Sequence, residues 1–175
     1  MALGQMTATG QQRKWLSIHN GTVELSENGQ KQSFSYVEGR LLPIYTQQRT
    51  FGGERVLRWF MDITDEAGET YSISFPYGSG TFKSIVLSLA SEQGLTASTI
   101  IRITPYLKNN YTNVTVTADG NKLSWVTSEL PAVEQVTVGS TQYKDDSKRM
   151  TFISSLVGGI NAKLRGGNIS NTEIP

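Results

Sequence analysis

Arginine, lysine and aromatic residues are the side chains whose types and spacing in this sequence could do chemistry. Arg58 and Phe60 lie two residues apart in a β-prone run, and Arg102, Tyr106 and Lys108 recur at even spacing in another. Residues two apart in a strand point to the same face of a sheet, so each run is expected to carry its cations and rings together. Guanidinium groups bind anions and aromatic faces stack on planar groups, so the pattern favours a binding surface.

The residues that most enzymes and metal sites need are scarce. The 175 residues include no cysteine and one histidine, His19, which excludes thiol chemistry, cysteine-bound zinc and histidine-rich metal sites. We therefore expect a protein that is not an enzyme and that uses no cofactor and no metal. The formal net charge is +1, so an anion-binding surface must arise from the local placement of charges.

Hydrophobic periodicity predicts the elements that would position these side chains. In residues 55–65, alternation places Leu57, Trp59, Met61 and Ile63 on one face, and Arg58, Phe60, Asp62 and Thr64 on the other. Gly39 and Pro43 interrupt the β-prone run 33–50 and predict a bend there. The expected order is strand, strand, strand, helix, strand, strand, over residues 33–50, 55–65, 69–76, 81–93 and 98–108 and, for the last strand, two pieces at 111–118 and 122–126. Asp119-Gly120 joins these two pieces and is the strongest hairpin signal in the sequence.

The remaining segments flank this central region. Residues 14–25 predict a hairpin or lead-in strand, residues 129–143 are loop-like with one β-prone piece at 133–138, and residues 148–164 predict a second amphipathic helix. We expect a flexible arm over 1–13, a single domain over 14–164 and a flexible tail over 165–175. No apolar run is long enough to span a bilayer and no secretory h-region is visible, so the prediction is a cytoplasmic protein without a membrane contact.

The order of strands and helix resembles the OB-fold, a five-stranded Greek-key barrel with a helix between its third and fourth strands. The expected class is therefore mainly β, a β-barrel with α, plus a C-terminal helix. Within that class the chain resembles the small single-stranded DNA-binding proteins, particularly phage-encoded ones. The resemblance covers a little over half of the chain, and it rests on the pattern of elements because no linear motif is present.

The resemblance implies a groove on the second and third strands, walled by the loop between strands one and two and the loop between strands four and five. The first loop would be residues 47–55 and the second 109–112. Phosphates would be held by cations, and bases would stack on rings with little regard to sequence. The expected nucleic-acid-binding residues are Arg49, Phe51, Arg55, Arg58, Phe60, Arg102, Tyr106, Lys108 and Tyr111.

Five of these residues also have a structural interpretation. Phe60 and Tyr106 are either stacking platforms or rings covered by the N-terminal hairpin or the second helix, and Phe51 is either a mobile fingertip or folded inward. Arg58 and Arg102 either contact phosphates or pair with Asp62 or Glu38 on a solvated face. Trp59 and Trp125 are expected in the core, while the position of Trp15 is undecided.

The leading hypothesis is a non-catalytic protein that coats single-stranded DNA during replication or recombination. RNA in place of DNA, homo-oligomer formation and recruitment of replication proteins by the C-terminal tail are left open. The alternative is a structural or assembly protein, such as a virion or scaffold component, that forms homo-oligomers without binding nucleic acid. A carbohydrate- or peptide-binding β module is a third, weaker option.

Overall fold

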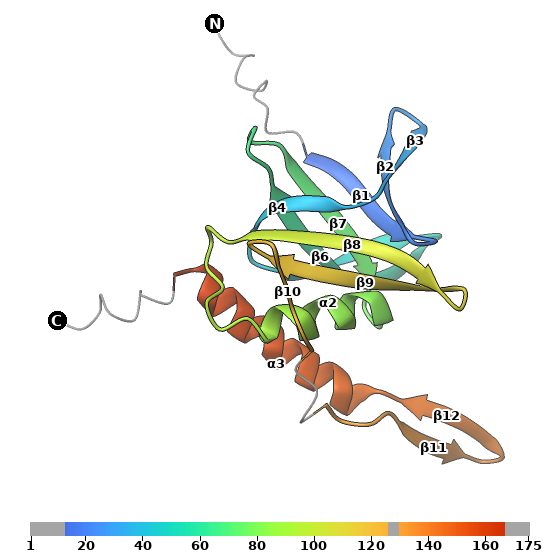
Figure 1. Ribbon diagram of the computed structural model, residues 1–175. Helices are drawn as coiled ribbons and strands as arrows, with labels where there is room; N and C mark the ends of the chain where they lie inside the picture. The colour runs from blue at the N-terminus through green and yellow to red at the C-terminus, as the bar shows by residue number, and fades with distance from the viewer. Residues whose placement is uncertain (1–12, 126–129, 167–175) are drawn as a thin grey trace, which may run out of the picture.

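The computed structural model describes residues 13–125 and 130–166, which form one strongly curled sheet with two helices and a separate hairpin (Figure 1). The strands of the main sheet are β1 (Arg13–His19), β2 (Thr22–Glu27), β3 (Gln30–Phe34), β4 (Val37–Leu41), β5 (Tyr45–Phe51), β6 (Glu54–Thr64), β7 (Thr70–Pro76), β8 (Ile100–Lys108), β9 (Tyr111–Ala118) and β10 (Asn121–Lys122). The helices are α2 (Gly80–Ala90) and α3 (Ser147–Leu164), and the hairpin is β11 (Glu134–Val138) with β12 (Thr141–Asp145). The mainly β class with helices is confirmed.

The main sheet has the order β10-β9-β8-β4-β6-β7-β1-β2-β3, with β5 paired to β6. Tight turns join several neighbours because the chain supplies residues that adopt a positive φ. Asn28 and Gly29 have φ of 53° and 77° between β2 and β3, and Asp119 and Gly120 have φ of 49° and 85° between β9 and β10. Such two-residue turns match the right-handed twist of the strands they connect, so these hairpins follow from local sequence.

The short strand β4 joins the two halves of the sheet. Its residues pair with β8 on one side and, at Arg40 and Leu41, with β6 on the other. Gly39 lies so close to β6 that a Cβ there would be 2.5 Å from the Thr64 carbonyl oxygen, so only glycine fits. Gly39 lies within β4, and the bend predicted there stays a prediction. The expected single run 33–50 instead divides into the end of β3, β4 and β5, with Pro43 between the last two.

Four ladders of the expected five-stranded arrangement are present, namely β4–β6, β6–β7, β4–β8 and β8–β9, all antiparallel. A ladder between β7 and β9, which would close the sheet, is not formed by the described strands. The free edge of β7 is instead paired in parallel with β1, as at Trp15 opposite Ser72. The sheet is therefore a half-barrel extended by an N-terminal hairpin, and the closed Greek key remains a prediction.

The inner face of the sheet and the helices enclose the hydrophobic core. Trp59, Met61 and Ile63 of β6 are buried there, and the Trp59 ring stacks on Phe82 of α2 with centroids 4.6 Å apart. Ser79 caps α2, because its Oγ accepts the backbone N–H of Phe82 at 3.1 Å. Both predicted helices are confirmed, with ends that differ by at most three residues from those expected over 81–93 and 148–164.

The second helix is fastened to the sheet by a buried amide. Asn161 of α3 accepts the backbone N–H of Ile44 and donates to its carbonyl oxygen, each at 2.8 Å. Ile44 lies in the loop between β4 and β5, directly before Tyr45. At the other end of α3, Asp145 accepts the Ser147 N–H at 2.9 Å, as expected for an acidic residue near this terminus.

The segment after β10 differs most from expectation. Trp125 was expected in the core but is 51% exposed, because β10 ends at Lys122 and no described strand continues beneath the ring. Residues expected to be mostly loop form the β11–β12 hairpin, which projects away from the sheet at the start of α3 (Figure 1).

The two expected flexible ends lie outside the described residues, except that Arg13 opens β1 and that Arg165 and Gly166 follow α3. No helix in the described ranges is long and apolar enough to cross a bilayer.

Candidate functional site

Four of the predicted binding residues meet on the outer face of the sheet. Arg49 and Phe51 of β5 and Arg58 and Phe60 of β6 line one surface hollow of about 270 Å³. Trp15 of β1 and Ser74 of β7 complete its lining. Strand pairing explains this meeting, because Ser74 lies opposite Phe60 and β1 continues the sheet beyond β7.

Arg49 lies over two rings of this hollow. Its guanidinium carbon is 4.9 Å from the centroid of Phe60 and 5.6 Å from that of Trp15. The two rings meet edge to face, with centroids 6.2 Å apart and planes at 79°. Cation–π contacts of this kind hold the charge near the surface without neutralising it.

Arg58 is held by a neutral partner. Its Nε donates to the Ser74 Oγ at 2.6 Å, and its guanidinium carbon lies 5.8 Å from the centroid of Phe51. Burial lowers the pKa of the Arg58 guanidinium, which nevertheless stays charged at neutral pH. Within the described ranges neither Arg49 nor Arg58 forms an ion pair with a carboxylate, so both keep their charge available.

The prediction that Phe60 is a stacking platform is wrong. Its side chain is only 2% exposed, because Tyr45 stacks on it with centroids 5.4 Å apart and Trp15 and Arg49 cover the rest. The open rings of the hollow are Trp15, at 43% exposed, and Phe51, at 55%. Trp15 was undecided in the sequence because nothing local indicates that β1 pairs with β7, some 55 residues later.

The prediction that residues 47–55 form a loop is also wrong. These residues belong to the β5–β6 hairpin, whose turn consists of Gly52 and Gly53 with φ of 57° and 87°. Arg55 pairs with Thr50 and lies an odd number of residues from Arg58 along β6. Because successive side chains of a strand point to opposite faces, Arg55 projects from the other face of the hairpin. Arg55 therefore does not join the hollow.

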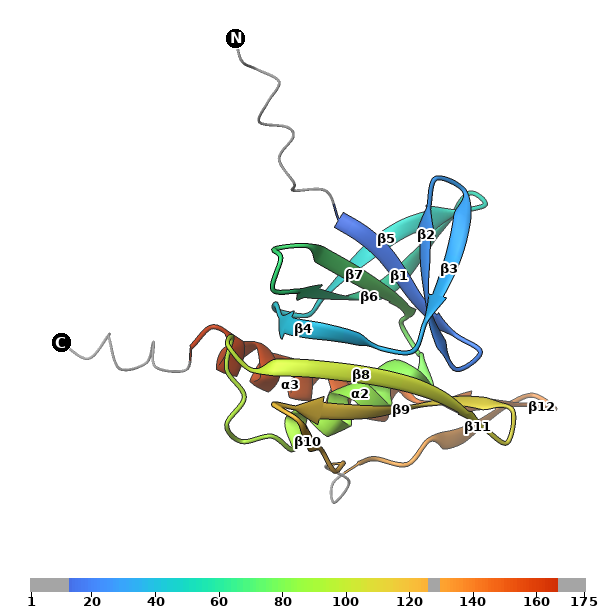
Figure 2. The ribbon, with the colours of Figure 1, turned by 45° about the horizontal axis from the view of Figure 1, so that its top comes forward.

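Three further predicted residues lie at the end of another hairpin. Tyr106 and Lys108 of β8 and Tyr111 of β9 share one face, since Lys108 pairs with Tyr111. The predicted loop 109–112 is reduced to a two-residue turn at Asn109 and Asn110, with φ of 53° and 65°. Figure 2 shows that the tip of the β8–β9 hairpin lies apart from the tip of the β5–β6 hairpin.

Arg102 is engaged by the protein itself. Its Nε donates to Glu38 at 2.9 Å, and its guanidinium carbon lies 3.9 Å from the centroid of Tyr36. The hydrogen bond to Glu38 raises the pKa of Arg102. The pairing with Glu38, one of the two interpretations of this residue, is therefore confirmed, and the nine predicted residues do not line one trough.

The outer face of β6 changes character towards its other end. Asp62 is buried there, where it accepts from Ser72 and forms an ion pair with Arg13 at 2.9 Å. Beyond it, the β6–β7 turn carries Asp65, Glu66 and Glu69. Negative charge thus gathers at this turn, while Arg49 and Arg58 lie in the half of the face away from it.

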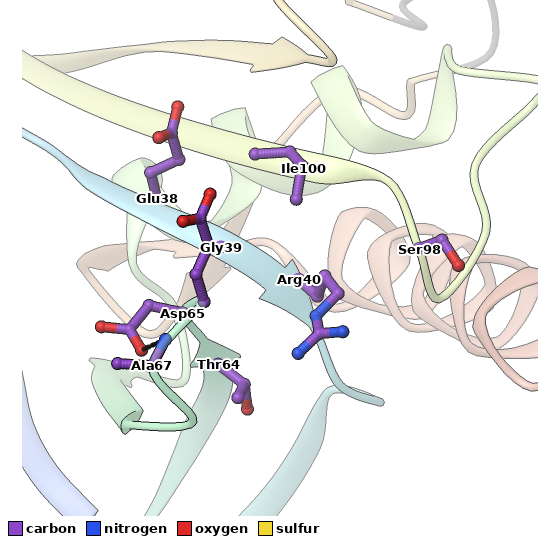
Figure 3. A pocket seen from close by; sticks show the side chains of 9 residues that line it. Glu38, Gly39, Arg40, Thr64, Asp65, Ala67, Ser98 and Ile100 are labelled. Carbon is purple, nitrogen blue, oxygen red and sulfur yellow. Dashed lines mark hydrogen bonds between the residues drawn. The ribbon is translucent and has the colours of Figure 1, made fainter.

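A larger hollow of about 790 Å³ lies beside this acidic turn. Figure 3 shows Glu38 and Arg40 projecting from β4, while Asp65 bonds back to the Ala67 N–H at 2.9 Å. Glu38 is already paired with Arg102, and the turn contributes Glu66 as well. Its carboxylates make this hollow unsuitable for a polyanion in spite of its size.

The described residues contain no group of three or more His, Cys, Asp or Glu side chains that could hold a metal ion. The hollow on the outer face offers two available cations and two open rings. No family model, no curated protein and no solved structure matches this chain.

Proposed function

We propose that this protein is a non-catalytic single-stranded DNA-binding protein and that the hollow lined by Trp15, Arg49, Phe51 and Arg58 is its binding site. The observation that carries the proposal is the pairing of two guanidinium groups, neither bound to a carboxylate of the described residues, with two exposed rings. An unpaired strand offers the matching groups, a phosphate for each cation and a base for each ring.

Phosphates would bind first to Arg58. Ser74 holds the Nε of Arg58, so the two terminal nitrogens remain to donate to phosphate oxygens in a fixed direction. Arg49 can serve a second phosphate, or can move off Trp15 and leave that ring to a base. This preorganisation lowers the entropy cost of binding, because the side chains are ordered before the ligand arrives.

Bases would stack on Trp15 and Phe51. Stacking on an aromatic side chain contributes about 1–3 kcal/mol per base and tolerates any sequence, because every base has a π-face. The lining has no carboxamide or carboxylate to match the edge of adenine or cytosine, and Arg58 and Ser74 are hydrogen-bonded to each other. The proposal is therefore binding with little sequence preference, suited to coating exposed strands in replication or recombination.

The place of the hollow supports the resemblance to the OB-fold. It lies on the outer face of β6 and β7, which correspond to the second and third strands of the expected order, and the β5–β6 hairpin forms one wall. Binding on that face is what the resemblance implies. The OB-type arrangement of the strands is part of this proposal.

A fluorescence titration with oligothymidylate at about 50 and 200 mM salt tests the proposal. We expect the protein to bind with quenching of tryptophan emission, and the affinity to fall steeply with salt as counterions are released. Trp15→Phe should remove most of the quenching, because Trp15 is the tryptophan of the hollow. Oligouridylate of equal length shows whether RNA binds as well as DNA.

Arg58→Gln and Arg102→Gln form a matched pair of variants. Arg58→Gln should weaken binding by about tenfold and reduce the salt slope by about one, whereas Arg102→Gln should change the affinity less than about twofold. The difference follows from Glu38, which already engages Arg102. Absence of binding by the wild-type protein, or equal losses in both variants, would contradict the proposed site.

One observation favours the alternative of a structural or assembly protein. The β11–β12 hairpin leaves Val136, Val138 and Tyr143 exposed, as expected for a surface that another protein covers. That function predicts defined homo-oligomers and no affinity for oligonucleotides. The same titration therefore separates the two functions.

A further inference from the structure

The β11–β12 hairpin makes few contacts with the rest of the molecule. Its base is held by an ion pair between Glu134 and Lys148 at 2.7 Å and by a hydrogen bond from Arg149 to the Pro131 carbonyl oxygen at 2.7 Å. Figure 1 shows the two strands extending beyond α3 without a neighbouring element. Isolated two-stranded hairpins are marginally stable in water, so a hairpin of this kind gains stability when a partner covers it.

The two faces of this hairpin differ in polarity. Val136 pairs with Tyr143 and Val138 with Thr141, so these four side chains share one face. The apolar members of this face are 39%, 54% and 62% exposed for Val136, Tyr143 and Val138. The opposite face is polar and consists of Gln135, Thr137, Gln142 and Lys144. Only the first face gains free energy from being covered.

The chain has a second exposed surface that complements this apolar face. At the tip of the β8–β9 hairpin, Tyr111 is 75% exposed and Tyr106 42% exposed, with Lys108 between them on the same face. Lys108 forms no ion pair with a carboxylate of the described residues. The tip is well supported, because Gly21 donates its N–H to the Thr112 Oγ1 at 3.1 Å and packs against Leu107.

Charge adds to the match in polarity. The apolar face of the β11–β12 hairpin ends at Asp145, which lies opposite Glu134 in the ladder. Glu134 is already paired with Lys148, whereas Asp145 forms no ion pair with a cation of the described residues. Backbone and side-chain hydrogen bonds from Ser147 lower the pKa of Asp145, so this carboxylate is charged at neutral pH. The Lys108 ammonium among rings on one surface thus has a complement in the Asp145 carboxylate beside aliphatic groups on the other.

We propose that the apolar face of the β11–β12 hairpin docks on the β8–β9 tip of a second copy of this chain. The two surfaces are different, so the contact is heterologous and links copies head to tail in an open chain unless the rotation closes a ring. This inference does not depend on the proposed DNA binding, and it assigns Tyr106, Lys108 and Tyr111 to a contact between protein copies.

The contact is small, and its size predicts weak association. Five-residue strands are about 17 Å long and a two-stranded hairpin is about 10 Å wide, so each contact buries a few hundred Å². Stable interfaces usually bury about 1,200–2,000 Å² in total. We therefore expect a contact that forms at high protein concentration and that a cross-linker can capture.

Cysteine cross-linking tests the contact directly, because the sequence has no cysteine of its own. Full-length Val138→Cys and Tyr111→Cys proteins are prepared separately, mixed in equal amounts and treated with a short bis-maleimide reagent. We expect the mixture to yield more cross-linked dimer than either protein alone, and the double variant to yield a ladder of oligomers. Lys108→Glu in the Tyr111→Cys protein should reduce the yield severalfold.

Thr137→Cys is the matched control, since it lies next to Val138 on the polar face of the same hairpin. Mixed with Tyr111→Cys, it should give only the background yield. Efficient cross-linking of Val138→Cys to itself would show hairpin-to-hairpin pairing and overturn the proposal. So would equal yields from Thr137→Cys and Val138→Cys, or yields that do not rise with protein concentration. Circular dichroism confirms that each variant is folded, so a loss of yield reports on the contact.

Discussion

The two faces of β6 are built from alternating residues of one strand, yet they are buried in different ways. On the inner face Trp59, Met61 and Ile63 pack under the helices, within a core whose members are nearly all apolar. On the outer face Phe60 and Asp62 are equally buried, but they are covered by long side chains from β1 and β5.

The difference teaches how one strand can serve both stability and binding. A face sealed by a helix can be opened only by moving the helix, whereas a face covered by Arg49, Trp15 and Tyr45 opens when those side chains rotate. Burial on the outer face is thus provided by groups that a ligand can replace. The following predictions test whether the two faces differ in this way.

The largest effect is expected on the inner face. Met61→Ala removes a fully buried side chain and leaves a cavity under α2, which should lower the free energy of unfolding by about 2–5 kcal/mol. Leu57→Ala is the control, because Leu57 lies on the same side of β6 but is 37% exposed, and it should cost less than about 1 kcal/mol. Urea denaturation measures both, and equal losses would show that the inner face is not sealed as described.

An intermediate effect is expected at the buried end of the outer face. Asp62→Ala leaves the hydroxyl of Ser72 without its acceptor and Arg13 without its ion pair, so we expect a loss of about 1–3 kcal/mol. Arg13 is 42% exposed and can turn to water, which limits the cost. Asp62→Asn retains an acceptor for Ser72 and should lose less. Equal losses in the two variants would mean that the charge of Asp62 matters more than its hydrogen bond to Ser72.

The smallest effect is expected at the β6–β7 turn, where the two faces end. Burial raises the pKa of the Tyr71 phenol above its ordinary value near 10, and the Asp65 carboxylate raises it further. The folded state therefore holds this proton more tightly than the unfolded state, so the associated stability is complete below about pH 10 and is lost as the pH rises through the folded-state pKa. In Tyr71→Phe the unfolding free energy should fall less steeply between about pH 9 and 11. Parallel curves for both proteins would refute this assignment.

Much of the fold follows from local patterns that the sequence displays. Alternation in β6 separates Trp59 from Phe60, and Asp119-Gly120 specifies a hairpin, because these signals depend on neighbouring residues alone. The hairpin at Gly139 was missed, since its strands carry few apolar residues and its turn lacks the Asn-Gly or Asp-Gly pair. The exposure of Trp125 was not predicted, because β10 ends at Lys122 and no local signal in the sequence sets the length of this strand.

The candidate site was predictable only in part. Arg49, Phe51 and Arg58 were identified by type and position, and they do meet. That Trp15 joins them, and that Phe60 lies beneath, depends on the parallel pairing of β1 with β7, a contact between distant segments without a sequence signature. Likewise, the alternation of side chains within β8 does not tell which strand lies beside it, so it could not decide whether Arg102 pairs with Glu38 of β4.

Asn161 supplies the backbone of Ile44 with the hydrogen bonds that a neighbouring strand would otherwise make. Its side-chain amide both accepts from the N–H and donates to the carbonyl oxygen of Ile44. An aspartate at this position would lack the donor, and a leucine would lack both donor and acceptor. Because Tyr45 comes next and begins β5, the helix layer fixes the point from which the strand carrying Arg49 and Phe51 departs. A helix on the inner side of the sheet thus positions a strand that lines the hollow on the outer side.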